Sequence, residues 1–192
     1  QTLQGMLLTG EEKFDVVFPA TVLKGAAAAV AGKTLKESAS LDGAVLSGFV
    51  LSALGDESVQ VRDAGAYVAS SLKTELIMPI LESYIDTDGN GEADLDRADR
   101  AAAGVALVMG RLANRNKERA FCKTVELRIC NLLYCPSDLV RAKAAEGLSA
   151  LIQVIPAEDA KALLEQFRKE LPGADPKAAA YGLAGVVKGL TS

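Results

Sequence analysis

The chain contains no histidine and no tryptophan among its 192 residues. Histidine is the commonest general base at neutral pH and a frequent zinc ligand, so its absence removes the usual centre of acid–base and zinc chemistry. The sequence also lacks a phosphate-binding P-loop, a GxSxG nucleophile turn and the kinase signature motifs. We therefore expect a protein that is not an enzyme, needs no cofactor and has no small-molecule substrate.

Cysteines and long apolar runs are also scarce. The three cysteines, Cys122, Cys130 and Cys135, have neither the density of a disulfide scaffold nor the paired spacing of a zinc site. We expect free thiols in a reducing compartment, which favours a cytoplasmic location. The longest purely apolar run covers residues 26–31, far short of the roughly 18 residues that cross a bilayer, so no membrane partner is expected.

Aromatic residues make up only 5% of the chain, whereas alanine and glycine are abundant. Small side chains suit closely packed helices better than a sheet with large inward-facing residues, so the composition favours an all-α fold. The net charge of −4 excludes the overall basic field of an autonomous nucleic-acid binder. Any contact with RNA would therefore be confined to a local patch.

A polar turn followed by an Ala-rich helix recurs along the chain. Residues 56–64 and 136–144 both open such a helix on a Val-Arg pair, and similar helices begin near residues 95 and 175. The second helix of each pair is thus predicted near 59, 95, 139 and 175, at intervals of 36, 44 and 36 residues. A period of about 40 residues is typical of a helical solenoid. We predict a HEAT-type α-solenoid of about four helix pairs.

The domain organisation follows from where this period holds. Residues 1–41 show helical patterns interrupted by proline and glycine, and we predict an irregular helical region there. Residues 42–192 are predicted to form the repeat array. The pattern is still helical at residue 192 and shows no polar capping repeat, so we expect a fragment of a longer array.

Three polar residues match a structural feature of HEAT arrays. Asp56 precedes Arg62 by six residues, and Arg141 occupies the corresponding place in a later repeat. A carboxylate in the turn can cap one helix and accept hydrogen bonds from a guanidinium of a neighbouring repeat. We interpret the three residues as a ladder that fixes the spacing between repeats.

The loop from residue 86 to residue 94 resembles a calcium-binding loop. Asp86, Asp88, Asn90 and Asp94 supply oxygen atoms at positions 1, 3, 5 and 9, with glycine at position 6. Arg97, however, stands at position 12, where a bidentate glutamate is required. A solvated turn between helices is the favoured interpretation, and weak calcium binding is the alternative.

Five cations surround one predicted turn between helices. They are Arg111, Arg115, Lys117, Arg119 and Lys123, opposed only by Glu118. Such a patch can release counterions from RNA phosphates or meet an acidic protein. Exposed helix ends also carry lysine and arginine for solubility and for the helix dipole, so both interpretations stay open.

Three stretches resemble one family of HEAT-repeat proteins. The distinctive stretch is KAAAYGLAGVVKGL at residues 177–190, and LVMGRLA at residues 107–113 and residues 51–62 resemble further parts of the family at compatible spacing. The family is the general-control translational activator, which activates the starvation-responsive initiation-factor kinase. The resemblance covers about residues 42–190 and is to a central fragment near the region similar to elongation factor three.

The resemblance implies a cytosolic, ribosome-associated scaffold. Proteins of this family promote activation of the kinase that phosphorylates the alpha subunit of translation initiation factor two during amino-acid starvation. The implied partners are proteins, the ribosome through the full-length protein, and the kinase indirectly. A generic HEAT adaptor between proteins and a HEAT-like bilin lyase are the alternatives, although few aromatic residues are available to line a bilin pocket.

Overall fold

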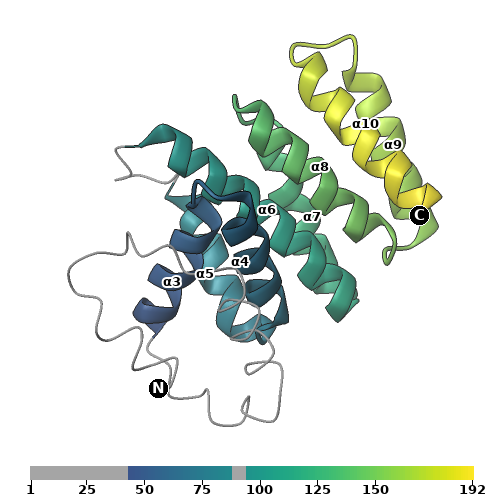
Figure 1. Cartoon of the computed structure of the whole chain (residues 1–192). Coiled ribbons are helices and arrows are strands. Elements are labelled where there is room, and N and C mark those ends of the chain that lie inside the picture. The colour runs from purple at the N-terminus through teal and green to yellow at the C-terminus, as the bar shows by residue number, and fades with distance from the viewer. Residues whose placement is uncertain (1–42, 88–93) are drawn as a thin grey trace. The chain divides into compact units, whose positions relative to one another are not determined.

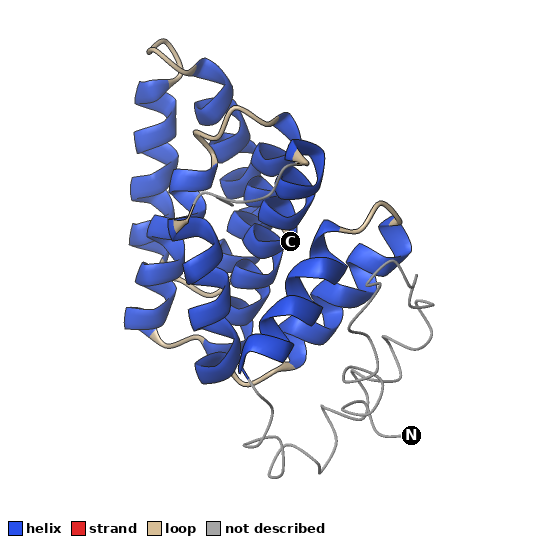
Figure 2. Cartoon of the chain, turned by 90° about the vertical axis from the view of Figure 1, so that its left-hand side faces the viewer, coloured by secondary structure: helices blue, strands red, loops and turns tan. Residues whose placement is uncertain are grey.

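A computed structural model describes residues 43–87 and 94–192 of the chain, and this part is built from helices joined by loops (Figures 1 and 2). The helices are α3 (Gly43–Gly55), α4 (Val59–Ser71), α5 (Thr74–Asp86), α6 (Leu95–Asn116), α7 (Arg119–Leu132), α8 (Asp138–Ile152), α9 (Ala157–Glu170) and α10 (Pro176–Thr191). No strand occurs in the described ranges. The region predicted as irregular, residues 1–41, lies outside them, so its organisation stays a prediction.

The helix starts confirm the all-α repeat fold. The second helices of the four pairs, α4, α6, α8 and α10, begin at Val59, Leu95, Asp138 and Pro176, within one residue of the predicted starts. Polar turn residues define three of these starts. Ser137 and Asp175 accept hydrogen bonds from the first turns of α8 and α10, and Asp94 accepts one from the amide of Arg97 in α6. Capping of this kind satisfies amides that have no partner within the helix.

The chain divides into two compact units, with the boundary at Ala102 inside α6. In the described part of the first unit, α3 packs on α4, and Gly65 of α4 lies close enough to Ala53 that a Cβ on the glycine would be 2.8 Å from the alanine Cβ. The core of this unit is aliphatic. Its largest fully buried side chains are Leu54, Leu72, Ile77 and Leu81.

In the second unit, α8 packs against α7 and α10, and α10 packs against α9 (Figure 1). A Cβ on Gly147 of α8 would overlap the carbonyl oxygen of Ala106 in α6, and one on Gly110 would overlap the backbone of Gly147. A Cβ on Gly185 of α10 would lie 2.6 Å from the carbonyl oxygen of Ala145 in α8. The second helices therefore approach each other backbone to backbone, which explains the abundance of glycine in these segments.

The core of the second unit lies between its first and second helices. The largest fully buried side chains are Met109, Leu112, Ile129, Leu133, Leu148, Leu151 and Phe167. The ring of Phe167 packs on Gly182, where a Cβ would be 2.6 Å from the ring. No helix in the described ranges is long and apolar enough to cross a membrane.

Candidate functional site

The five cations predicted as a contact surface lie at the junction of α6 and α7. Arg111 and Arg115 are on the last turns of α6, Lys117 lies in the two-residue link, and Arg119 and Lys123 are on the first turns of α7. Lys117 has a φ of 60°, and its amide donates to the carbonyl of Ala113 at 2.9 Å. This left-handed conformation ends α6 sharply and starts α7 after only one more residue.

A groove of about 550 Å³ opens beside this junction. One side is formed by Lys117, Arg119, Cys122, Lys123 and Glu126, and the other by Val154, Ile155, Pro156 and Asp159. The second set comes from the turn between α8 and α9 and, for Asp159, from the first turn of α9, one repeat further along the chain. The groove thus lies within the second unit and combines three cations, two carboxylates and an apolar segment of the second turn.

Two ion pairs reduce the positive charge of the groove. Lys123 Nζ lies 2.5 Å from Glu126 Oε1, and Arg119 Nη2 lies 3.6 Å from Asp159 Oδ2. The hydrogen bond to Glu126 is the main cause of the raised pKa of Lys123, so this amine stays charged at neutral pH. Both cationic side chains are more than two-thirds exposed, at 70% for Lys123 and 76% for Arg119. The partly exposed pair of Arg119 with Asp159 contributes only about 0–1 kcal/mol, so a bound partner can replace it at small cost. Glu126 is buried and needs Lys123 as its counter-ion, so this second pair is retained when a partner binds.

The three cysteines are free thiols. Cys122 lies at the groove but is buried, and its pKa is raised first by burial and then by the charge of Glu118. Burial also raises the pKa of Cys130, to about 12. Both side chains therefore stay protonated at neutral pH, and a protonated thiol is a poor nucleophile.

The residues predicted as a ladder make related contacts at two turns. Arg62 Nη1 donates to the carbonyl oxygen of Asp56 at 2.6 Å, and Arg141 Nε donates to the carbonyl oxygen of Cys135 at 2.6 Å. Both guanidinium groups thus hold the backbone six residues earlier, where the turn begins. The carboxylate of Asp56 instead accepts from the amide of Ser58 at 2.8 Å.

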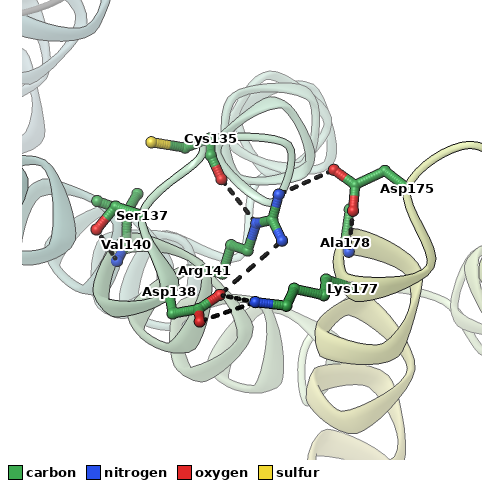
Figure 3. A network of polar contacts seen from close by, with 8 residues as sticks. All are labelled: Cys135, Ser137, Asp138, Val140, Arg141, Asp175, Lys177 and Ala178. Atoms are coloured by element: carbon green, nitrogen blue, oxygen red, sulfur yellow. Dashed lines mark hydrogen bonds and ion pairs between the residues drawn. The ribbon is translucent and has the colours of Figure 1, made fainter.

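Arg141 also connects two repeats, as Figure 3 shows. Its Nη2 donates to Asp175 Oδ2 at 2.9 Å, and the second oxygen of Asp175 accepts from the amide of Ala178 in the first turn of α10. An outer ion pair between Lys177 and Asp138, at 3.1 Å, joins the same two helices. Arg141 is buried, with 7% of its surface exposed, so its charge depends on these partners.

Sequence reasoning missed Asp175 and a further arginine, Arg100, in this role. Arg100 Nε donates to the carbonyl oxygen of Gly55 at 2.8 Å, which links α6 to the end of α3 within the first unit. Its signal was present in the sequence, because Asp94 precedes Arg100 by the same six residues that separate Asp56 from Arg62. The signal for Asp175 was its place directly before Pro176, where a capping residue is expected.

The calcium-loop candidate falls largely outside the described residues. Asp88 and Asn90 lie there, whereas Asp86 is the last residue of α5 and Asp94 precedes α6. Asp94 Oδ1 caps α6 through the amide of Arg97, and its Oδ2 lies 3.8 Å from Arg100. Within residues 43–87 and 94–192, no three Asp, Glu, His or Cys side chains gather as a metal site requires. Calcium binding by the complete loop stays a prediction.

Comparison with known proteins identifies two similar proteins. The chain is 30% identical over 154 residues, 74% of its length, to the human stalled ribosome sensor GCN1. It is 28% identical over 158 residues, 76% of its length, to the Arabidopsis thaliana protein ILITYHIA. The chain spans only 6% of each relative. No protein-family model matches the chain, and no solved structure matches it. The similarity supports a relationship to GCN1-like helical-repeat proteins without assigning the chain to a particular part of them.

Proposed function

We propose that the chain is a scaffold segment of a ribosome-associated protein. The observation that carries this proposal is the similarity to a stalled ribosome sensor, which extends over three quarters of the chain. The helix pairs within each unit agree with it, because proteins built from such repeats bind large partners through their surfaces rather than through a catalytic pocket. On this proposal the segment has no catalytic activity of its own and acts in the cytoplasm.

The finer role that we propose is translational control. The protein containing this segment would promote activation of the kinase that phosphorylates the alpha subunit of initiation factor two during amino-acid starvation. The segment would support that role by holding the array together and by offering the α6–α7 junction as a contact surface. It would reach the kinase only indirectly, through the remainder of the protein.

Sedimentation of the full-length protein with ribosomes tests the proposal. In extracts of cells treated with a low dose of an elongation inhibitor, the intact protein is expected in the polysome fractions of a sucrose gradient. Nuclease digestion of the linking messenger RNA should shift it to the monosome and nuclease-resistant disome fractions. A protein that stays at the top of the gradient under both conditions would refute a ribosomal role.

Phosphorylation of initiation factor two tests the finer role. Deleting residues 95–192 from the full-length protein removes the α6–α7 junction and the helix pairs after it. After amino-acid withdrawal, cells that carry the deletion should phosphorylate the alpha subunit less than cells with the intact protein. Unchanged phosphorylation at equal protein abundance would reject a contribution of this segment.

A generic adaptor between proteins is the second candidate. The mixed character of the groove favours it, because Val154, Ile155 and Pro156 offer apolar contact beside Arg119 and Lys123. The two candidates differ in the sedimentation experiment, since an adaptor without a translational role has no reason to follow polysomes.

A further inference from the structure

We infer that the groove between the α6–α7 and α8–α9 turns binds an extended, acidic segment of a partner protein that inserts an apolar side chain. This inference names the partner class for the contact surface and rests on the proposed scaffold function. It also excludes an RNA strand as the occupant. Its basis is the combination of groove volume, charge and apolar surface within the second unit.

The volume and lining of the groove suit a side chain rather than a flat surface. A space of about 550 Å³ can receive one or two large apolar side chains. Val154, Ile155 and Pro156 lie together in the chain and line it, and all three are partly exposed. An apolar side chain placed against them would remove apolar surface from water on both partners, with a gain of roughly 25 cal/mol per Å².

The cations around the groove favour carboxylates of the partner. Lys117, Arg119 and Lys123 line it, and Lys117 is exposed. A partner carboxylate can replace Asp159 beside the exposed Arg119. It can also join Lys123, whose side chain is 70% exposed although it is paired with the buried Glu126. A partner segment with acidic residues on either side of an apolar residue would be complementary to these cations and to the apolar part of the groove.

The start of α7 adds to the attraction for carboxylates. Arg119 is the first residue of this helix, its first turn contains no acidic residue, and the side chain of Glu118 makes no capping hydrogen bond. The amides of a first helical turn and the positive end of the helix dipole both favour a nearby negative charge. By contrast, α9 already carries Glu158 and Asp159 in its first turn.

Two features of the groove disfavour RNA. Asp159 and Glu126 separate the cations, so the groove offers discrete positive positions and not the continuous basic track that a phosphate backbone requires. No aromatic side chain lines the groove, whereas proteins that bind single-stranded RNA use aromatic residues to stack the bases. A peptide avoids both problems because its charges are discrete and its apolar side chain needs no stacking platform.

Selection from a displayed library tests the inference with the complete 192-residue chain. The probe is a random library of peptides about 12 residues long, which covers an extended segment across one repeat. We expect enrichment of sequences with two or more Asp or Glu residues around a Leu, Ile, Met or Phe. The most enriched peptide, labelled with fluorescein, is then titrated by fluorescence anisotropy against the chain and its variants.

Three variants separate charge, apolar contact and general electrostatics. Lys117→Glu with Arg119→Glu should weaken binding about tenfold or more, and Ile155→Ser about threefold or more. The matched control, Lys169→Glu with Lys188→Glu, makes the same charge change on exposed residues outside the groove lining and should alter affinity by less than about twofold. Circular dichroism melts establish that each variant is folded before its affinity is compared.

The inference would be overturned if the selection enriched no acidic–apolar peptides, or if the control variant weakened peptide binding as much as the groove variants do. It would also be overturned if a labelled RNA of about 20 nucleotides bound through Lys117 and Arg119 more tightly than the peptide. The ribosome sedimentation experiment is independent of these results. A protein that sediments with ribosomes although its groove binds no peptide would retain the proposed function and lose only this inference. Peptide binding without ribosome sedimentation would leave the generic adaptor.

Discussion

Replacing Arg141 by methionine should destabilise the junction of α8 and α10 while keeping most of the side-chain volume. Arg141 is buried and donates to two acceptors, the carbonyl oxygen of Cys135 at 2.6 Å and Asp175 Oδ2 at 2.9 Å (Figure 3). Methionine fills a similar space but donates no hydrogen bond. The substitution therefore removes the buried polar connection between the two repeats without opening a large cavity, and the outer pair of Lys177 with Asp138 stays.

The size of the effect depends on how well water can replace the lost donors. A hydrogen bond to a charged group contributes about 1.5–3 kcal/mol. The side chain of Asp175 is 31% exposed, so water can solvate its carboxylate in the variant, and the lower end of this range applies. Removing a buried charge also relieves a desolvation cost. Arg141 loses two such hydrogen bonds, each at about 1.5 kcal/mol, and the relief of desolvation offsets part of their sum. We therefore expect Arg141→Met to lower the free energy of unfolding of this unit by about 2–3 kcal/mol.

Asp175→Asn isolates the ion pair in a double-mutant cycle. Asparagine is a good capping residue and can keep the hydrogen bond from the amide of Ala178, whereas it loses the charge that faces Arg141. The coupling energy between Arg141 and Asp175 should be about 1–2 kcal/mol. Lys177→Met is the surface control, because its pair with Asp138 is 66% and 56% exposed and should contribute less than about 0.5 kcal/mol.

Urea unfolding followed by circular dichroism at 222 nm gives the total change, and hydrogen exchange on the amides of α8 and α10 gives the local change. Local exchange is needed because the chain contains two compact units, which need not unfold together. A loss below about 1 kcal/mol for Arg141→Met would refute the reasoning. So would Asp175→Asn having the same effect with and without Arg141.

Gly147→Ala should lower the free energy of unfolding by more than about 3 kcal/mol, because its Cβ would overlap the carbonyl oxygen of Ala106. Gly48→Ala should raise it by about 0.5–1 kcal/mol through helix propensity, because a Cβ at Gly48 would meet no neighbouring group within 4 Å. Thermal unfolding measures both, and shifts of the same sign would contradict the close helix crossing. Cys130 is half-buried and its pKa is raised to about 12, so iodoacetamide should alkylate it at pH 8 more slowly in the folded chain than in urea. Equal rates, measured by mass spectrometry of the labelled peptide, would contradict the raised pKa. The hydrogen bond from Tyr134 to Glu170 raises the pKa of the phenol from 10.0 to about 12. The unfolded chain therefore loses this proton at a lower pH than the folded chain does, and the free energy of unfolding should fall as the pH rises from 10 to about 12. Tyr134→Phe should remove that part of the fall, and an absorbance titration at 295 nm in which all tyrosines of the folded chain ionise near pH 10 would refute it.

The helix pairs could be predicted because their signals are local. Apolar residues at helical spacing and polar turns recur with a period of about 40 residues, and each second helix begins within one residue of its predicted start. The close approach of α6 and α8 at Gly110 and Gly147 could not be predicted in the same way. Glycine within a helix is compatible with a close crossing, a kink or an unremarkable exposed position, and only the packed partner distinguishes them.

The candidate site was predictable on one side only. The cations of the α6–α7 junction are close in sequence, so their grouping needed no knowledge of packing. The opposite side comes from Val154, Ile155, Pro156 and Asp159, about one repeat later. Since equivalent turns of a solenoid lie side by side, aligning the predicted helix starts would have brought these residues together. The two ion pairs within the groove could not be predicted, because the positions of charged residues in the sequence do not show which of them lie close together.

The Arg141 network and the groove are far enough apart to be perturbed separately. Arg141 lies at the beginning of α8, and Val154 follows the end of the same helix. A helix of 15 residues is about 22 Å long, which exceeds the roughly 10 Å beyond which substitutions usually act additively. A variant that weakens the repeat junction should therefore leave the intrinsic peptide affinity of the folded chain unchanged, and a groove variant should leave the unfolding free energy nearly unchanged. Loss of binding in Arg141→Met at a temperature where the unit is still folded would instead show that repeat spacing controls the shape of the groove.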